Sequence, residues 1–191
     1  MRWARLLSAA ISAGALGASA GCTFMWGSED ERVRTFRIPS SAMEPTLHCA
    51  RPAPGCLADA QDEVEVRPEE KYERGDIVVF ETPSAARRQC GAGGLYVKRI
   101  VGLPRERVAI TPDGVVSLNG GRLDESDYLD PERRGGVPGR WTVGPDEYFL
   151  LGDNRTQSCD SRIWGVLPRE NIVGSVFAIV RPSGRIELER N

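Results

Sequence analysis

Residues 108–120 read VAITPDGVVSLNG, and this stretch decides the fold class. Two short runs rich in valine and isoleucine, 108–110 and 115–118, are separated by a Pro-Asp-Gly turn sequence, and Asn-Gly follows the second run. β-Branched residues favour strands, and Asp-Gly or Asn-Gly favours a tight turn between antiparallel strands. The stretch therefore predicts a series of β-hairpins.

Further strand-like runs occur along the chain, at residues 33–37, 77–80, 95–101, 148–151 and 172–180. Helical periodicity is largely absent beyond the N-terminal segment. We expect residues 49–68, which are rich in Pro, Ala and acidic residues, to be irregular, and residues 122–141 to form a surface excursion. Many short strands with frequent Gly and Pro turns predict a mainly β domain, an antiparallel sandwich or barrel-like structure.

The composition excludes several classes of function. A formal net charge of -2 leaves no basic excess to neutralise phosphates, so no nucleic-acid partner is expected. The chain has one histidine, His48, and none of its 5 cysteines forms a Cys-x-x-Cys pair. A structural metal site is therefore not expected, and no motif implies an organic cofactor.

An apolar segment precedes the β-rich part. Leu6–Gly27 contains no charged residue, and at about 1.5 Å per residue a helix of this length reaches about 33 Å, enough to cross a bilayer core. Arg2 and Arg5 lie before it and acidic residues follow, which places the N-terminus inside. We therefore expect residues 1–28 to be one transmembrane anchor and residues 29–191 to be an exported domain.

Two alternatives remain for the N-terminal segment. The sequence Ala18-Ser19-Ala20 has the small-x-small form of a secretory cleavage site, and the residues up to Cys22 are similar to a lipoprotein box. All three interpretations put the globular part outside the cytoplasm.

Four cysteines follow the apolar segment, which permits two disulfides in an oxidising compartment. Cys49 and Cys56 bracket a Pro-rich loop and are the more local pair, which leaves Cys90 and Cys159. Free thiols in a reducing compartment are the alternative.

Four stretches carry the chemistry. In chain order they are IPSSAMEPTL (38–47), RGDIVVF (74–80), YVKRIVGLP (96–104) and GDNRTQSCDSRIWG (152–165). Together they resemble the ordered boxes of bacterial type I signal peptidases, the Ser/Lys peptidase family S26. The resemblance implies a mainly antiparallel β fold behind one transmembrane helix, displayed on the outer face of the cytoplasmic membrane. It also implies a serine endopeptidase that removes signal peptides from exported preproteins at small-x-small sites, without a cofactor.

The local sequence and the resemblance select the same general base. A lysine can accept a proton only if its neutral form is populated, and burial among apolar groups lowers its pKa. Lys98 lies in an apolar strand, whereas Lys71, the other lysine, has acidic neighbours that favour its charged form. Lys98 is therefore the candidate base.

The resemblance assigns supporting roles to further residues. Ser158 matches a serine that orients the base, and Ser40 matches a position that helps to stabilise the oxyanion beside the amide of residue 42. Asp153, Asp160 and Arg162 match polar residues that hold the site loop, with Asp160 and Arg162 forming a charge pair.

Residue 42 departs from the family pattern. The nucleophilic serine of the Ser-Met-x-Pro-Thr-Leu motif directly precedes Met, and here Ala42 precedes Met43. A methyl group cannot attack a carbonyl, and loss of the nucleophile in a comparable serine protease costs about 10⁶ in turnover. Three explanations compete: natural loss of activity that leaves a signal-peptide-binding pseudoenzyme, an engineered Ser→Ala knockout, and takeover by Ser41 or Ser40. Takeover is disfavoured because neighbouring side chains on an extended loop point in opposite directions.

The surroundings of Lys98 can be specified further. We expect its amine about 3 Å from the Ser158 hydroxyl, close to the Ala42 methyl and beyond hydrogen-bond range of any carboxylate. Asp153 and Asp160 should then be occupied by Arg155 and Arg162.

Overall fold

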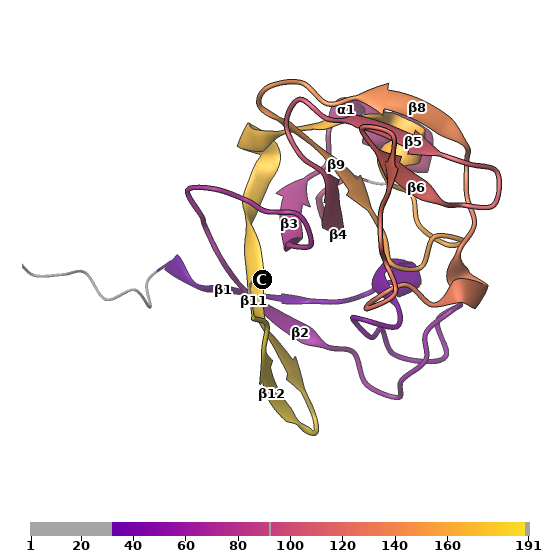
Figure 1. Ribbon diagram of the computed structural model, residues 1–191. Coiled ribbons are helices and arrows are strands. Elements are labelled where there is room, and N and C mark those ends of the chain that lie inside the picture. Colours follow the sequence, from indigo (N-terminus) through magenta and orange to yellow (C-terminus); the bar gives the residue numbers. More distant parts are fainter. Residues whose placement is uncertain (1–31, 92, 190–191) are drawn as a thin grey trace, which may run out of the picture.

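The structure is a computed structural model that describes residues 32–91 and 93–189 (Figure 1). In chain order its elements are β1 (Arg34–Arg37), the 3₁₀ turn η2 (Ser41–Met43), β2 (Glu63–Arg67), β3 (Ile77–Glu81), α1 (Ser84–Cys90), β4 (Leu95–Gly102), β5 (Arg107–Ile110), β6 (Val116–Leu118), β7 (Gly121–Arg122), η3 (Pro131–Arg133), β8 (Gly139–Thr142), β9 (Glu147–Leu151), α2 (Ser161–Trp164), β10 (Leu167–Pro168), η4 (Arg169–Asn171), β11 (Ile172–Arg181) and β12 (Gly184–Glu187).

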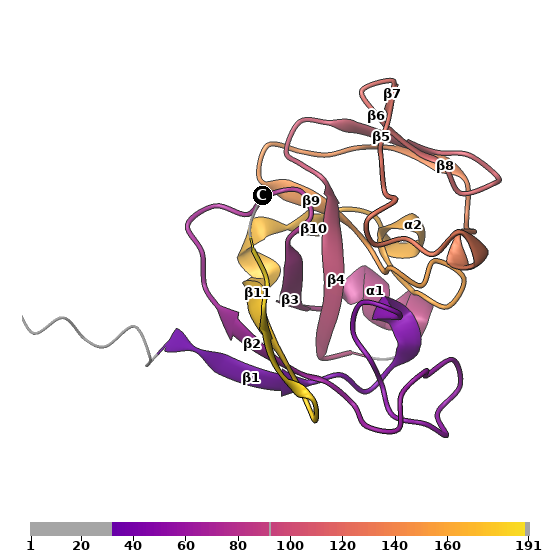
Figure 2. The same ribbon diagram turned by 60° about the horizontal axis from the view of Figure 1, so that its bottom comes forward.

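The strands form two antiparallel sheets. Over the described residues, the larger sheet has the order β1-β2-β11-β3-β4-β9-β10, with β12 paired to β11, and the smaller has the order β7-β6-β5-β8. The smaller sheet lies at one end of the molecule, and β1, β2 and β12 lie at the opposite end (Figures 1 and 2). The fold is therefore mainly antiparallel β, as the sequence predicts.

Strand β3 explains how the larger sheet is covered on both faces. Ile77 and Val79 pack into one apolar cluster with residues of β2 and β11, whereas Val78 and Phe80 pack into a second cluster with residues of β9 and α2. Alternating side chains of a strand point to opposite faces, so a continuous apolar run is buried on both. A third cluster joins β9 to the smaller sheet.

The expected strands are confirmed, but residues 49–68 are not irregular throughout. Strand β2 occupies residues 63–67 and pairs with β1 and β11. Its sequence is EVEVR, in which Val64 and Val66 are buried in the core and the charged residues point outward. The sequence analysis missed this strand because the segment is rich in acidic residues, although buried valines alternate regularly with charged residues in it.

Two further expectations need correction. The short helix α1 was not expected from the sequence, because its seven residues span too few turns to show a helical period. The excursion at residues 122–141 is not confined to the surface, since Glu125 and Leu129 are buried, and its last residues belong to β8.

Two disulfides form, Cys49–Cys56 and Cys90–Cys159. The first closes a loop after η2, and the second joins the end of α1 to the segment before α2. Both pairs are those favoured by the cysteine spacing.

The expected anchor, residues 1–28, and the candidate processing positions Ala20 and Cys22 lie outside the described residues. Within residues 32–91 and 93–189 no helix has the length and apolar character needed to span a membrane.

Candidate active site

A groove of about 440 Å³ contains the residue in the nucleophile position and the candidate base. Its wall is formed by the β1 segment and the residues after it, by the first half of β4, and by the loop before α2. The lining residues used below are Phe36, Ile38, Ser40, Ala42, Val97, Lys98, Gln157 and Cys159. Segments far apart in the sequence therefore meet at one apolar groove with a few polar groups.

The main chain at position 42 is fixed by the fourth motif. Residues Ser41–Met43 form a 3₁₀ turn rather than the extended loop expected from the sequence. The Asn154 backbone N–H donates to the Ala42 carbonyl at 3.1 Å, and the Asn154 side-chain amide donates to the Ser41 carbonyl at 3.0 Å. Asn154 is fully buried, so these bonds are shielded from water.

Gly152 allows this close approach. A Cβ atom at this position would lie 2.4 Å from the Ala42 carbonyl oxygen and 2.2 Å from the Ser158 hydroxyl oxygen. Because no side chain fits there, the glycine lets Ser158 and the turn at position 42 pack against the same backbone.

Lys98 is buried without a carboxylate partner among the described residues. It is 4% exposed, and its Nζ donates to the Val97 carbonyl at 2.8 Å. Desolvation lowers the pKa of Lys98 to about 8; the carboxylates of Asp160 and Asp153, at longer range, oppose the shift, and the Arg162 guanidinium adds to it. A substantial neutral fraction therefore exists near neutral pH.

The expected hydrogen bond between Lys98 and Ser158 is not formed. The Ser158 hydroxyl is buried and has no hydrogen-bond partner among the described residues. The amine of Lys98 turns instead to the carbonyl of the residue before it. Lys98 lines the groove and Ser158 does not. The sequence does not determine the rotamer of a four-carbon side chain.

The expected partner of Asp153 is also wrong. Asp153 pairs with Arg99 at 2.9 and 2.7 Å, whereas Arg155 pairs with Glu125. Arg99 follows Lys98 on β4 and points to the opposite face, where Asp153 lies. Asp160 does pair with Arg162, at 2.7 Å, as predicted.

Ser40 and Ser41 occupy different environments. Ser40 is exposed and lines the groove, and its side chain makes no capping hydrogen bond. Ser41 is buried, and its hydroxyl donates to Gln157 Oε1 at 2.8 Å. Ser41 does not line the groove and its hydroxyl is already bound to Gln157, which weighs against its use as a substitute nucleophile.

Neither His48 nor Lys71 lines the groove. His48 Nδ1 lies 2.7 Å from Glu44 Oε2, next to the first disulfide, and the Lys71 side chain is 83% exposed. Over the described residues, no cluster of three or more His, Cys, Asp or Glu side chains is arranged to hold a metal ion.

The sequence interpretation missed four residues of the site: Arg99, Gly152, Asn154 and Gln157. All four belong to quoted motifs, so membership of a motif was a usable signal. Their roles depend on contacts across more than 50 residues of chain, which local sequence does not reveal.

Comparisons with known proteins identify the family of this chain. Residues 24–181 match the family described as signal peptidase, peptidase S26. A protein named probable signal peptidase I-2 from Synechocystis sp. is 37% identical over 168 residues, which cover 82% of this chain and 69% of the relative. A signal peptidase I from Leptolyngbya laminosa is 34% identical over 164 residues, 81% of this chain and 74% of the relative. A crystal structure of a signal peptidase I from Enterococcus faecalis V583 is 29% identical, covers 56% of this chain and 97% of that chain, and has a TM-score of 0.43.

This chain belongs to the signal peptidase family, whose enzymes are serine endopeptidases of the signal peptidase I type.

Proposed function

We propose that the groove binds the signal peptide of an exported preprotein as an added β-strand. Strand β9 pairs with β4 only from Arg99 onward, so the first half of β4 has β3 on one side and the groove on the other. The β1 segment forms the opposite wall. Main-chain pairing supplies affinity in such a site, and shallow apolar positions select small side chains.

The proposal rests on one observation: Ala42 lines the same groove as Lys98, which is buried and has no carboxylate partner among the described residues. With serine at position 42, the neutral amine of Lys98 accepts the hydroxyl proton as the oxygen attacks the scissile carbonyl. Ser158, whose hydroxyl has no partner in the described part of the chain, receives a hydrogen bond from the amine once it leaves the Val97 carbonyl. The Ser40 hydroxyl and the amide of residue 42 stabilise the oxyanion.

Ala42 favours a second function for the sequence as it stands. The chain keeps the candidate residues Lys98, Ser158 and Ser40, but no hydroxyl is available at position 42. The chain then binds signal peptides without cleaving them. The same groove and the same small-x-small preference serve both functions.

The proposed place of action is the outer face of the cytoplasmic membrane. The two disulfides support an oxidising compartment, and the apolar segment before residue 28 supports an anchor in membrane lipid. Exported preproteins are the proposed partners.

The deciding experiment compares the parent chain with Ala42→Ser on one preprotein. We expect the parent to bind without cleavage and Ala42→Ser to cut after a small-x-small site, at a rate higher by a factor on the order of 10⁶ over any residual activity. Ala42→Ser combined with Lys98→Met is the matched control and should be slower than Ala42→Ser by about 10²- to 10⁴-fold.

Cleavage by the parent would contradict the binding function, and Ser41→Ala and Ser40→Ala would then identify the substitute nucleophile. Failure of Ala42→Ser to cleave any preprotein would contradict the catalytic function.

A further inference from the structure

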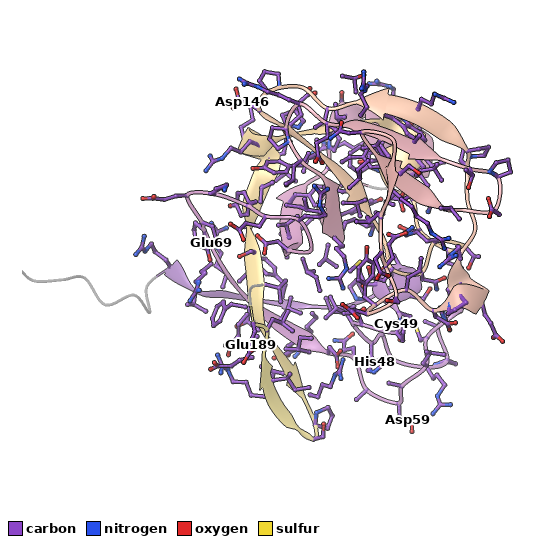
Figure 3. The ribbon with its side chains drawn as sticks, in the orientation of Figure 1. His48, Cys49, Asp59, Glu69, Asp146 and Glu189 are labelled. Atoms are coloured by element: carbon purple, nitrogen blue, oxygen red, sulfur yellow. A yellow bond between two sulfur atoms is a disulfide. The ribbon has the colours of Figure 1, made fainter. Side chains whose placement is uncertain are left out.

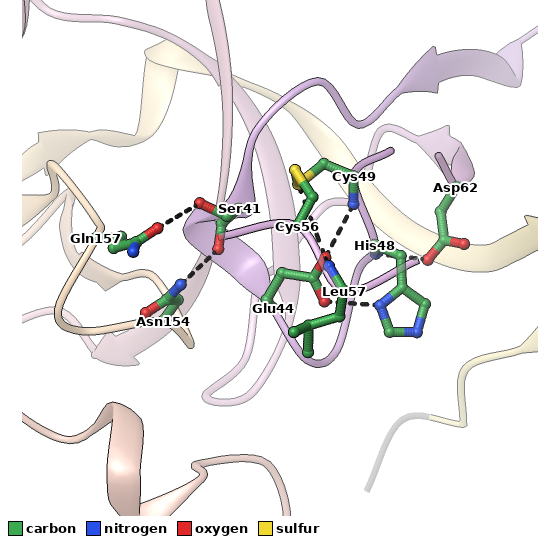
Figure 4. The surroundings of a disulfide bond; sticks show 9 residues. All are labelled: Ser41, Glu44, His48, Cys49, Cys56, Leu57, Asp62, Asn154 and Gln157. Atoms are coloured by element: carbon green, nitrogen blue, oxygen red, sulfur yellow. Dashed lines mark hydrogen bonds and ion pairs between the residues drawn. A yellow bond between two sulfur atoms is a disulfide. The ribbon is translucent and has the colours of Figure 1, made fainter. Parts of the chain in front are cut away.

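Glu44 is a fully buried carboxylate at the neck of the Cys49–Cys56 loop. One oxygen accepts from the backbone N–H groups of Cys49 and Leu57, both at 3.1 Å, and the other lies 2.7 Å from His48 Nδ1 (Figure 4). Cys49 and Leu57 stand at the two ends of the disulfide loop. The carboxylate therefore holds both ends of this loop at one point.

The same residue closes the turn at position 42. The backbone N–H of Glu44 donates to the Ser41 carbonyl at 3.1 Å, and Asn154 binds that carbonyl from the other side. The main chain around Ala42 is thus fixed by Asn154 on one side and by Glu44 on the other.

The C-terminal end of the disulfide loop, at Gly55, reaches the groove wall. A Cβ atom at Gly55 would lie 2.0 Å from Gln157 Oε1 and 2.7 Å from the Ser41 hydroxyl. Gln157 lines the groove, and its side chain accepts from Ser41. The loop therefore packs on the turn at position 42 directly, in addition to its attachment through Glu44.

Glu44 does not line the groove, so it can affect the reaction only through the turn that it holds. A hydroxyl at position 42 must stay within hydrogen-bond reach of its base, and a displacement of about 1 Å can cost about 10²-fold in rate. We propose that Glu44, together with the Cys49–Cys56 loop, is a positioning residue that fixes the main chain of residue 42 relative to Lys98. This inference rests on the proposed function.

The kinetic test uses Ala42→Ser as the background. Glu44→Met keeps the side-chain volume and removes both acceptor oxygens, and we expect kcat to fall by about 10- to 100-fold while KM changes less than about threefold. Glu44→Gln keeps an acceptor for Cys49 and Leu57 and a polar group beside His48 Nδ1, so kcat should stay within about threefold. The matched control is Asp59→Asn: Asp59 lies on the next stretch of chain, points outward and pairs only with exposed Arg51 (Figure 3).

Replacing Cys49 and Cys56 by serine tests the same path. If the loop acts through Glu44, the combined loss in kcat with Glu44→Met should be no larger than the greater single loss. A normal kcat for Glu44→Met, with only a lower melting temperature, would overturn the inference, because a purely structural carboxylate has that effect.

A second readout does not require cleavage. In Ala42→Cys, the thiol at residue 42 is alkylated with iodoacetamide, and peptide mass identifies the modified residue. The alkylation rate depends on the position of this thiol relative to Lys98. We expect Glu44→Met to change this rate at least about fivefold and Glu44→Gln to leave it unchanged. If Ala42→Ser is inert but the alkylation rate responds, the proposed function fails and the positioning inference stands. If alkylation is insensitive to Glu44→Met, the inference fails whatever the activity.

Discussion

Lys98 and Arg99 are neighbours on β4, but they point to opposite faces of the strand and only Arg99 contacts a carboxylate. Both residues are buried, at 4% and 8% exposure. The Lys98 amine donates to the Val97 carbonyl and lies 5.4 Å from the centroid of the Tyr96 ring, and no carboxylate among the described residues pairs with it. The Arg99 guanidinium donates to both oxygens of Asp153 and to the Gly75 carbonyl.

The pKa values follow from this difference. Burial lowers the pKa of Lys98 to about 8, because no carboxylate contacts it. Burial acts in the same direction on Arg99, but the charge and hydrogen bonds of Asp153 outweigh it and raise the pKa. Burial alone therefore does not lower the pKa of a basic side chain. Lys98 has a lowered pKa because the contacting carboxylate, Asp153, lies on the opposite face of β4.

The largest expected effect is the loss of the base. In the Ala42→Ser chain, Lys98→Met should lower kcat by about 10²- to 10⁴-fold, because no other group of the groove accepts the proton. Lys71→Met, at the exposed lysine, should leave kcat unchanged. In the Ala42→Ser chain kcat/KM should rise with pH and level off above about pH 8, as Lys98 loses its proton. Equal rates for Lys98→Met and its background would show that Lys98 is not the base.

The second-largest expected effect is the loss of stability when Arg99, on the face of β4 opposite to Lys98, loses its carboxylate partner. Asp153→Asn leaves a buried guanidinium without its counter-charge, and we expect the free energy of unfolding in urea to fall by about 3–5 kcal/mol. Glu63→Gln, which breaks an exposed pair with Arg37, should cost no more than about 1 kcal/mol. Because Asp153 also raises the pKa of Lys98 from a distance, Asp153→Asn should move the pH profile of the Ala42→Ser chain to lower pH. A loss below about 1 kcal/mol would mean that Arg99 finds other partners.

Stability should depend on pH through Lys98. The pKa of Lys98 is about 8 in the folded chain and 10.5 for an ordinary lysine, so between these values the unfolded chain binds more protons. Stability therefore increases as pH rises through this window. Relative to Lys98→Met, the free energy of unfolding of the parent should rise by up to about 3 kcal/mol between pH 8 and 10.5. Below pH 8 the cost of burying the charged lysine is present in full. Urea unfolding of both proteins across this range measures the difference, and parallel curves would exclude a depressed lysine.

Only part of the contrast between the two faces of β4 could be predicted from the sequence. Lys98 could be chosen because Val97 and Ile100 are its neighbours along the chain, and desolvation depends on such neighbours. The partner of Asp153 could not be chosen, because Arg99 and Arg155 differ in the face on which each points and not in type. The rotamer that carries the Lys98 amine away from Ser158 is likewise set by tertiary packing.

The fold was more predictable than the site for a related reason. Strands such as β3 and β11 are made of β-branched residues whose burial on both faces shows as a continuous apolar run. Strand β2 was missed because its two buried valines alternate with glutamates. The pattern of apolar and polar residues in the sequence therefore predicts burial well but predicts pairing between distant polar groups poorly.

The smallest expected effect isolates the ring that covers Arg99. Tyr128 lies with its ring centroid 4.1 Å from the Arg99 guanidinium carbon, and its hydroxyl donates to Glu125 Oε1 at 2.8 Å. Desolvation and the nearby Glu125 raise the pKa of Tyr128, so the phenol remains neutral and keeps this hydrogen bond.

Tyr128→Phe removes the hydrogen bond and keeps the ring, whereas Tyr128→Leu removes both. The difference in unfolding free energy between these two variants measures the ring over the cation, and we expect about 1 kcal/mol. Combining each variant with Asp153→Asn sharpens the measurement. If the ring acts on the cation, its contribution should grow once Asp153 no longer neutralises Arg99; an unchanged difference would mean that Tyr128 contributes by apolar packing alone. Neither substitution should alter the pH profile of the Ala42→Ser chain, because Tyr128 covers the face of β4 opposite to Lys98.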